Sequence, residues 1–170
     1  MTQDERLEFL IEVFRAEFKE YEKLCVPADR DGKRQLLRGL MNVRMPGPMS
    51  AEVLAVQDAY LCERAEEKGI IGLQDIPVIR NGLSVWQGDI TRLAVDAIVN
   101  AANSAMLGCF VPGHNCIDNC IQTYAGVQMR AECDRQMKLL KREYGQSYVQ
   151  PTAIPLLTDG YNLPAKKVVH

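Results

Sequence analysis

The spacing of apolar residues changes near residue 75, and this change limits the possible folds more than any other feature of the chain. Before it, apolar side chains recur at helical spacing in three stretches, which cover residues 3–24, 33–43 and 50–69. After it come short runs rich in β-forming residues, at 76–79, 83–86 and 97–99. A helical pattern over 117–144 follows, with further strand patterns near 148–156 and at 166–170.

This order of elements predicts an α/β fold behind a helical segment. Asn81-Gly82 is a two-residue hairpin signal between the first two strands. Strands and helices in this succession form layered sheets, with loops at the strand ends. We therefore expect an N-terminal helical extension over residues 1–75 and a three-layer α/β/α sheet over residues 76–170.

The charge balance argues against a nucleic-acid partner. Lys and Arg total 20 against 22 Asp and Glu, a formal net charge of −2, and no run of like charges resembles a nucleic-acid-binding tail. No apolar stretch approaches the roughly 20 residues that a membrane span needs, and the charged start differs from a secretory signal. The chain is predicted to be cytoplasmic, with a small molecule or a protein as its partner and no membrane association.

Cysteine spacing indicates a metal site. Four of the six cysteines lie in a window of 25 residues together with His114. Cys109, His114 and Cys116 lie within eight residues, just before a predicted helix, and thiolate and imidazole are ligands that zinc favours. Three protein ligands with an open fourth position are typical of a catalytic zinc site. The alternative is that the cysteines are small buried apolar residues.

Cys120 leaves a second arrangement of the metal open. If the helix begins near Cys116, then Cys120 lies one turn later on the same face, where it would complete a closed structural site of three cysteines and one histidine. Cys120 also fits the apolar stripe of this helix, so packing explains it without a metal. We prefer the open site of three ligands.

Two further segments follow predicted strands. The segment Asn100–Asn103 stands at a strand's carboxyl end, where open α/β sheets bind ligands, and carboxamides there suit sugar hydroxyls. Asn also favours turns for backbone reasons. In the segment Gln87–Thr91, the carboxylate of Asp89 would accept a hydrogen bond from an adenine amino group, or it would cap a helix.

Taken in order, these segments resemble the macrodomain family. The resemblance rests on Gly88–Thr91, on Asp96–Asn103, on Ile117–Asn119 and on Gly160–Lys166 with the strand that follows. Where ordinary macrodomain hydrolases have a run of glycines, this chain has the loop of Cys109, His114 and Cys116. That loop and the leader segment Asn42–Pro48 are similar to the zinc-dependent macrodomains of certain microbes.

The resemblance implies a function and roles for single residues. Family members bind ADP-ribose and remove mono-ADP-ribose from proteins, in many cases from a lipoyl-carrier protein modified by a sirtuin-type transferase. The resemblance implies that Asp89 and Ile90 bind adenine and that Asn100 and Asn103 bind the distal ribose. It implies that Cys109, His114 and Cys116 bind Zn²⁺ and that Asp118 lies beside the reacting sugar. Asn103 and Asp118 are thereby the expected catalytic residues.

Two departures from the family pattern are visible. Where related sequences often have histidine directly after the Ile117–Ile121 run, this chain has Gln122, so a role that needs an imidazole there is in doubt. Macrodomains also continue beyond the point that matches His170, with a second Gly-rich loop around the diphosphate. We therefore expect residues 76–170 to be the N-terminal part of a macrodomain, with the chain truncated and of uncertain activity by itself.

Two other functions remain open from the sequence. One is a non-catalytic ADP-ribose-binding module whose zinc only shapes a loop, and the other is a zinc-stabilised interaction module without a nucleotide site. A fold alone does not decide among them.

Overall fold

Four helices precede the first strand in the computed structural model, which describes all of residues 1–170. Their bounds are α1 Gln3–Arg15, α2 Lys19–Glu22, α3 Arg30–Val43 and α4 Ala51–Lys68. The three longer helices begin at residues whose side chains accept a hydrogen bond from the first turn, namely Thr2, Asp29 and Ser50. They pack through one apolar core that includes Leu10, Phe14 and Leu37.

The first helix of the structure is shorter than the apolar pattern that predicted it. We predicted one helix over 3–24, but α1 ends at Arg15 and Phe18 takes an extended conformation with φ −140° and ψ 131°. The ring of Phe18 lies edge-on against Tyr21, at a centroid distance of 5.2 Å. The apolar spacing over 16–24 therefore belongs to a turn and the short α2, so this prediction of helix length was wrong.

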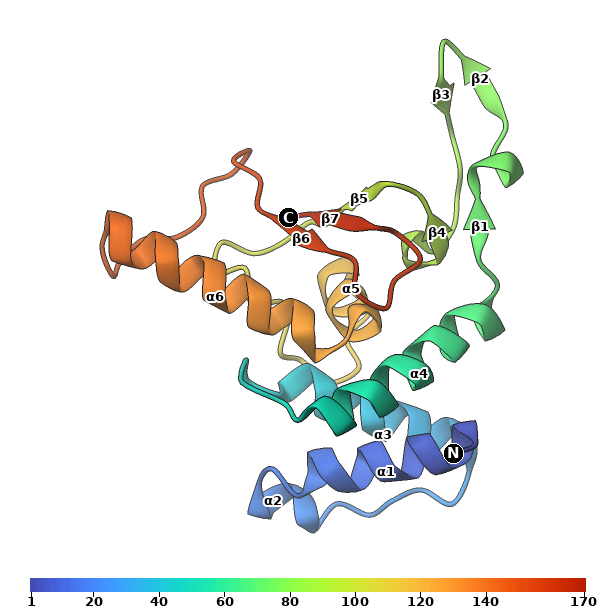
Figure 1. The fold of residues 1–170 in the computed structure, drawn as a ribbon, viewed down its shortest axis with the longest axis vertical. Helices are drawn as coiled ribbons and strands as arrows, with labels where there is room; N and C mark the ends of the chain where they lie inside the picture. The colour runs from blue at the N-terminus through green and yellow to red at the C-terminus, as the bar shows by residue number, and fades with distance from the viewer.

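Strands begin earlier than predicted. The first pair is β1 Ile71–Gly72 with β4 Leu93–Ala94, in parallel. The predicted hairpin is present as antiparallel β2 Val78–Arg80 and β3 Leu83–Ser84, and Asn81 and Gly82 both have positive φ, as its turn requires. In Figure 1 this hairpin projects away from the rest of the molecule, and its strand residues are exposed.

The main sheet has three strands in the order β5-β7-β6. β5 Ala97–Val99 runs parallel to β7 Lys167–Val169, and β6 Leu157–Asp159 runs antiparallel to β7. The helices α5 and α6 lie on one side of this sheet (Figure 1), and the second core fills the space between them and the sheet. The opposite face is exposed, with Val99 at 71%.

Two predictions in this half were wrong in detail. The helix predicted over 117–144 is two helices, α5 Ile117–Ala125 and α6 Val127–Tyr144. Gly126 separates them with φ +96°, and a Cβ there would lie 2.6 Å from Nε2 of Gln57. The strand predicted near 148–156 is irregular chain, because Pro151 and Pro155 lack the N–H that a ladder needs; β6 begins only afterwards.

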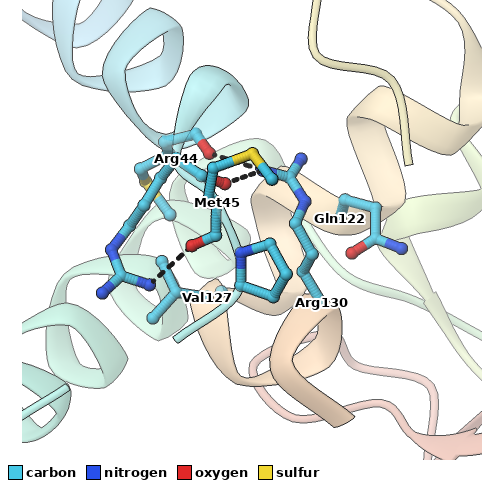
Figure 2. A pocket seen from close by; sticks show the side chains of 8 residues that line it. Arg44, Met45, Gln122, Val127 and Arg130 are labelled. Carbon is cyan, nitrogen blue, oxygen red and sulfur yellow. Dashed lines mark hydrogen bonds between the residues drawn. The ribbon is translucent and has the colours of Figure 1, made fainter. Parts of the chain in front are cut away.

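A buried arginine joins the helical segment to α6. Figure 2 shows Arg130 reaching toward the backbone beside Arg44 and Met45. Its Nη1 donates to the carbonyl oxygens of Arg44, Asn42 (2.9 Å) and Met41 (3.2 Å), which lie at or just beyond the end of α3. The last carbonyls of a helix lack partners within it, so Arg130 satisfies acceptors that packing would otherwise leave unpaired.

The helical segment and the sheet-bearing part thus share a buried interface. α3 and α4 both pack against α5. The boundary expected at residue 75 remains a prediction, although β1 already lies before it. None of the helices combines the length and the apolar character that crossing a membrane requires.

Candidate functional site

The chain forms a hollow where the parallel strands β5 and β7 end. Its volume is about 440 Å³, within the range typical of small-ligand sites. Its walls are the segment 99–106 after β5, the segment 150–155, and the end of β7 at Val169 and His170. This is the edge at which an open α/β sheet binds ligands, as the sequence predicted for Asn100 and Asn103.

Asn100 connects three elements at the base of this hollow. It is 4% exposed, and its Nδ2 lies 2.9 Å from Oδ1 of Asp118 and 3.1 Å from Nδ1 of His170. Its Oδ1 has no hydrogen-bond partner within the protein. A buried carbonyl oxygen without a hydrogen-bond partner is energetically costly, so this position is unusual in a folded protein.

Asp118 lies in the first turn of α5 and is 5% exposed. Burial raises the pKa of its carboxyl, while the hydrogen bond from Asn100, the backbone of Asn103 and the charge of Arg130 act in the opposite direction. A carboxyl with a raised pKa is a better proton acceptor than an ordinary exposed aspartate. The structure thus places the predicted catalytic residue Asp118 against the predicted ribose-side residue Asn100.

His170 is partly buried on the other side of Asn100. Burial lowers its pKa from 6.5 to about 4, so the ring is neutral near pH 7. Because Asn100 donates to Nδ1, the proton is assigned to Nε2, which lies 2.9 Å from Oγ1 of Thr158. The imidazole therefore orients the Asn100 side chain.

We expect His170 to make the protein less stable as pH falls from about 6.5 to about 4. In this window the unfolded chain binds a proton that the folded chain excludes, so linkage lowers the free energy of unfolding. The raised pKa of Asp118 has the opposite effect on stability over falling pH, so the contribution of His170 is measured by comparing the wild type with a His170 variant. Urea unfolding at pH 7 and 4.5 should show a smaller loss for His170→Gln than for the wild type. Equal losses would contradict this.

The loop between β5 and α5 gathers the predicted metal ligands. The ligand atoms of Cys109, His114 and Cys116 all lie within 4.8 Å of one another, and Sγ of Cys109 is 3.4 Å from Nδ1 of His114. In a tetrahedral zinc site with standard bond lengths, a sulfur and a nitrogen ligand lie about 3.6 Å apart. Two sulfurs and one imidazole in this arrangement fit zinc.

Cys120 is not part of this group. Its Sγ lies 3.5 Å from a guanidinium nitrogen of Arg38, and burial raises the pKa of its thiol. Cys116 is also the N-cap of α5, where its Sγ accepts from the N–H of Asn119 at 3.4 Å. The geometry therefore favours the three-ligand arrangement over the closed site.

Asn119 holds the loop from within and was not assigned a role from the sequence. It is fully buried, and its Nδ2 donates to the carbonyl oxygens of Cys109 (3.2 Å) and Val111 (3.1 Å). Asn103 also holds the backbone of this region: its Nδ2 donates to the carbonyl oxygen of Gly108 and its Oδ1 accepts from the N–H of Ala105. The side chain of Asn103 thus shapes the loop as well as lining the hollow.

Parts of this chain are similar to known proteins. Residues 99–170 match the Macro domain family. A protein-ADP-ribose hydrolase of Treponema medium is 49% identical over 100% of this chain and 64% of its own length. One of Staphylococcus aureus (strain MRSA252) is 44% identical over 97% of this chain and 60% of its own length. The chain thus spans about three fifths of the length of these relatives.

A solved structure supports the fold. The crystal structure of a Trypanosoma brucei macrodomain in complex with ADP-ribose has a TM-score of 0.50 at 22% identity, covering 78% of this chain and 57% of that chain. The predicted fold class is confirmed: the chain has a macrodomain-like α/β fold preceded by N-terminal helices. Within residues 1–170, however, helices cover one face of the main sheet and not both, as the three-layer prediction had it.

Asp89 and Ile90 lie outside both the 440 Å³ hollow and the residues matched to the Macro domain. Oδ1 of Asp89 accepts from the N–H and the hydroxyl of Thr91, at 3.0 and 2.6 Å, so it caps the short helix η2 Ile90–Arg92. Its Oδ2 lies 3.7 Å from Nζ of Lys68, which sits over the ring of Tyr124. The capping alternative is therefore realised, and an adenine role remains a prediction.

Gln122, the position at which a departure from the macrodomain pattern was expected, lies on α5. It is 4% exposed, and neither polar atom of its amide has a hydrogen-bond partner in the protein. Figure 2 shows Gln122 beside Arg130, at the wall of a small cavity that also includes Met45 and Val127. Its amide neither contacts the metal ligands nor lines the larger hollow.

Proposed function

We propose that this protein is a zinc-dependent hydrolase that removes mono-ADP-ribose from modified proteins. The observation that carries the proposal is the 49% identity over the whole chain to a protein-ADP-ribose hydrolase. Two features of the site support it: the hollow at the ends of β5 and β7, and the group of Cys109, His114 and Cys116 in the loop that leaves the hollow. The domain limits at residue 75 and a cytoplasmic location belong to the same proposal.

The reaction joins water to C1″ of the distal ribose. The water oxygen bonds to C1″, the bond from C1″ to the acceptor side chain breaks, and the acceptor leaves with a proton. Zinc held by the Cys109, His114 and Cys116 side chains would supply Lewis acidity at the reacting sugar. Asn103 orients the ribose, and Asp118 orients the attacking water or accepts its proton.

The buried contacts of Asp118 suit this role. Asn100 donates to one of its carboxylate oxygens, which fixes the side chain in the first turn of α5. The hydrogen bond to Asp118 leaves Oδ1 of Asn100 without a partner in the protein. We assign adenine binding to Asp89 and Ile90. Oδ2 of Asp89 is not used in capping η2 and lies 3.7 Å from Nζ of Lys68. The proposed substrate includes a lipoyl-carrier protein modified by a sirtuin-type transferase.

A hydrolysis assay tests this function. The protein is incubated with a mono-ADP-ribosylated protein before and after zinc chelation, and released ADP-ribose is measured beside ADP-ribose affinity by calorimetry. We expect chelation to abolish release, zinc to restore it, and affinity to change little. Affinity without any release would indicate a non-catalytic ADP-ribose-binding module, and the absence of both would indicate an interaction module.

A further inference from the structure

The helical segment reaches directly into the loop that carries the metal ligands. In Figure 1 the chain between β5 and α5 passes close to α3. The guanidinium of Arg38, on α3, donates through Nη2 to the carbonyl oxygen of His114 at 2.7 Å and through Nη1 to Oδ1 of Asn115 at 3.1 Å. Nη2 also lies 3.2 Å from Oδ1 of the buried Asn119.

A second side chain of α3 holds the same loop one turn later. Asn42 is fully buried, and its Oδ1 accepts from the N–H of Gly113 at 2.9 Å. Its Nδ2 donates to Oγ1 of Thr123 on α5 at 2.6 Å. Residues four apart on a helix share a face, so Arg38 and Asn42 together present one polar edge to the loop.

These contacts fall on both sides of His114. Asn42 fixes the peptide unit that ends at Gly113, and Arg38 fixes the peptide unit that begins at His114. Gly113 has φ +67° and His114 is exposed, so the loop itself provides little packing around this ligand. The position of the imidazole against Sγ of Cys109 therefore depends on α3.

Arg38 differs from its neighbours in having no carboxylate partner. Arg34, one turn earlier, pairs with Asp31 and Glu67 on the helical segment. No carboxylate lies within ion-pair distance of Arg38, whose Nη1 and Nη2 groups donate to the loop and to α5 instead. The planar fork of a guanidinium reaches two acceptors at once, which an ammonium cannot do in the same geometry.

We propose that Arg38 and Asn42 are positioning residues of the metal site, and that α3 holds His114 where it can bind the ion. This inference rests on the zinc site of the proposed function. On this proposal, the N-terminal helical segment contributes directly to zinc binding. Groups that orient metal ligands from outside the coordination sphere typically change metal affinity 10- to 100-fold when removed.

Zinc affinity of the purified protein tests the inference without any activity measurement. Zinc dissociation constants are measured by competition with a chromogenic chelator for the wild type, Arg38→Ala and Arg34→Ala. We expect affinity to fall about 10- to 100-fold in Arg38→Ala and to be unchanged in Arg34→Ala. Arg38→Lys should recover only part of the loss, and Asn115→Ala should cause a smaller loss in the same direction.

The metal-free proteins separate positioning from a general loss of structure. Circular dichroism and thermal unfolding of the apo forms should give similar values for Arg38→Ala and Arg34→Ala, so that only metal affinity distinguishes them. If Arg38→Ala does not fold, Arg38→Lys takes its place, with weakened zinc binding again expected. Zinc binding by a folded Arg38 variant as tight as that of the wild type overturns the inference. A wild type that binds no zinc overturns the zinc site itself.

Discussion

Cys116→Ser is expected to remove zinc from the protein and to lower the rate of ADP-ribose release by about 1000-fold or more. A bound metal contributes several kcal/mol to the stabilisation of transition-state charge, and each 1.4 kcal/mol is a factor of ten in rate. The serine oxygen replaces the Cys116 sulfur as the hydrogen-bond acceptor that caps α5. The start of the helix is therefore preserved while the thiolate ligand is lost. Elemental analysis and the release assay measure the two effects.

Cys120→Ala is the matched control. Cys120 lies one turn along α5 from Cys116 but outside the group of ligand atoms, so this variant should retain about one zinc per chain. Loss of zinc from Cys120→Ala would instead support the closed site of three cysteines and one histidine. Unchanged zinc content in Cys116→Ser would show that the loop is not the metal site.

Arg130→Ala is expected to lower the free energy of unfolding by about 3–5 kcal/mol. The substitution removes the donor shared by three carbonyl oxygens near the end of α3. Each buried acceptor left without a partner costs about 1–3 kcal/mol, and the cation also faces the negative end of the helix dipole. Burial lowers the pKa of Arg130 only to about 10, so it is charged at neutral pH. Urea unfolding with an unchanged m-value measures the loss.

Arg135→Ala provides the comparison on the same helix. Arg135 is exposed and pairs with Glu132 one turn before it, an arrangement that contributes at most a few tenths of a kcal/mol. We expect this variant to lie within about 0.5 kcal/mol of the wild type. If Arg130→Ala costs no more than Arg135→Ala, the interface between the helical segment and α6 does not depend on this residue.

The error in the helix predicted over 117–144 has its origin in tertiary packing. The helical spacing over 117–144 is continuous, but the helix is interrupted at Gly126. There Gln57, from α4, occupies the space that a Cβ would need, and its side chain accepts a hydrogen bond from the N–H of Val127. Apolar spacing shows which residues can share a face. It does not show where a side chain from another helix interrupts the backbone.

The sequence by itself determined the features that depend on near neighbours. The Asn81-Gly82 turn, the caps at Asp29 and Ser50, and the approach of Cys109 to His114 all involve residues within a few positions of each other. For such features the backbone preferences of glycine, asparagine and serine, together with the chemistry of thiol and imidazole, are sufficient.

Only the tertiary structure decided which groups orient those ligands. Arg38 and Asn42 meet the loop across more than 70 positions of sequence, and Asn100 meets Asp118 and His170 across 18 and 70. The sequence around Arg38 reads as the polar side of an amphipathic helix, because periodicity reports the burial of apolar faces and not the partners of polar ones. Those partners are set when α3, α5 and the sheet pack together, since hydrogen bonds require positions accurate to a few tenths of an ångström.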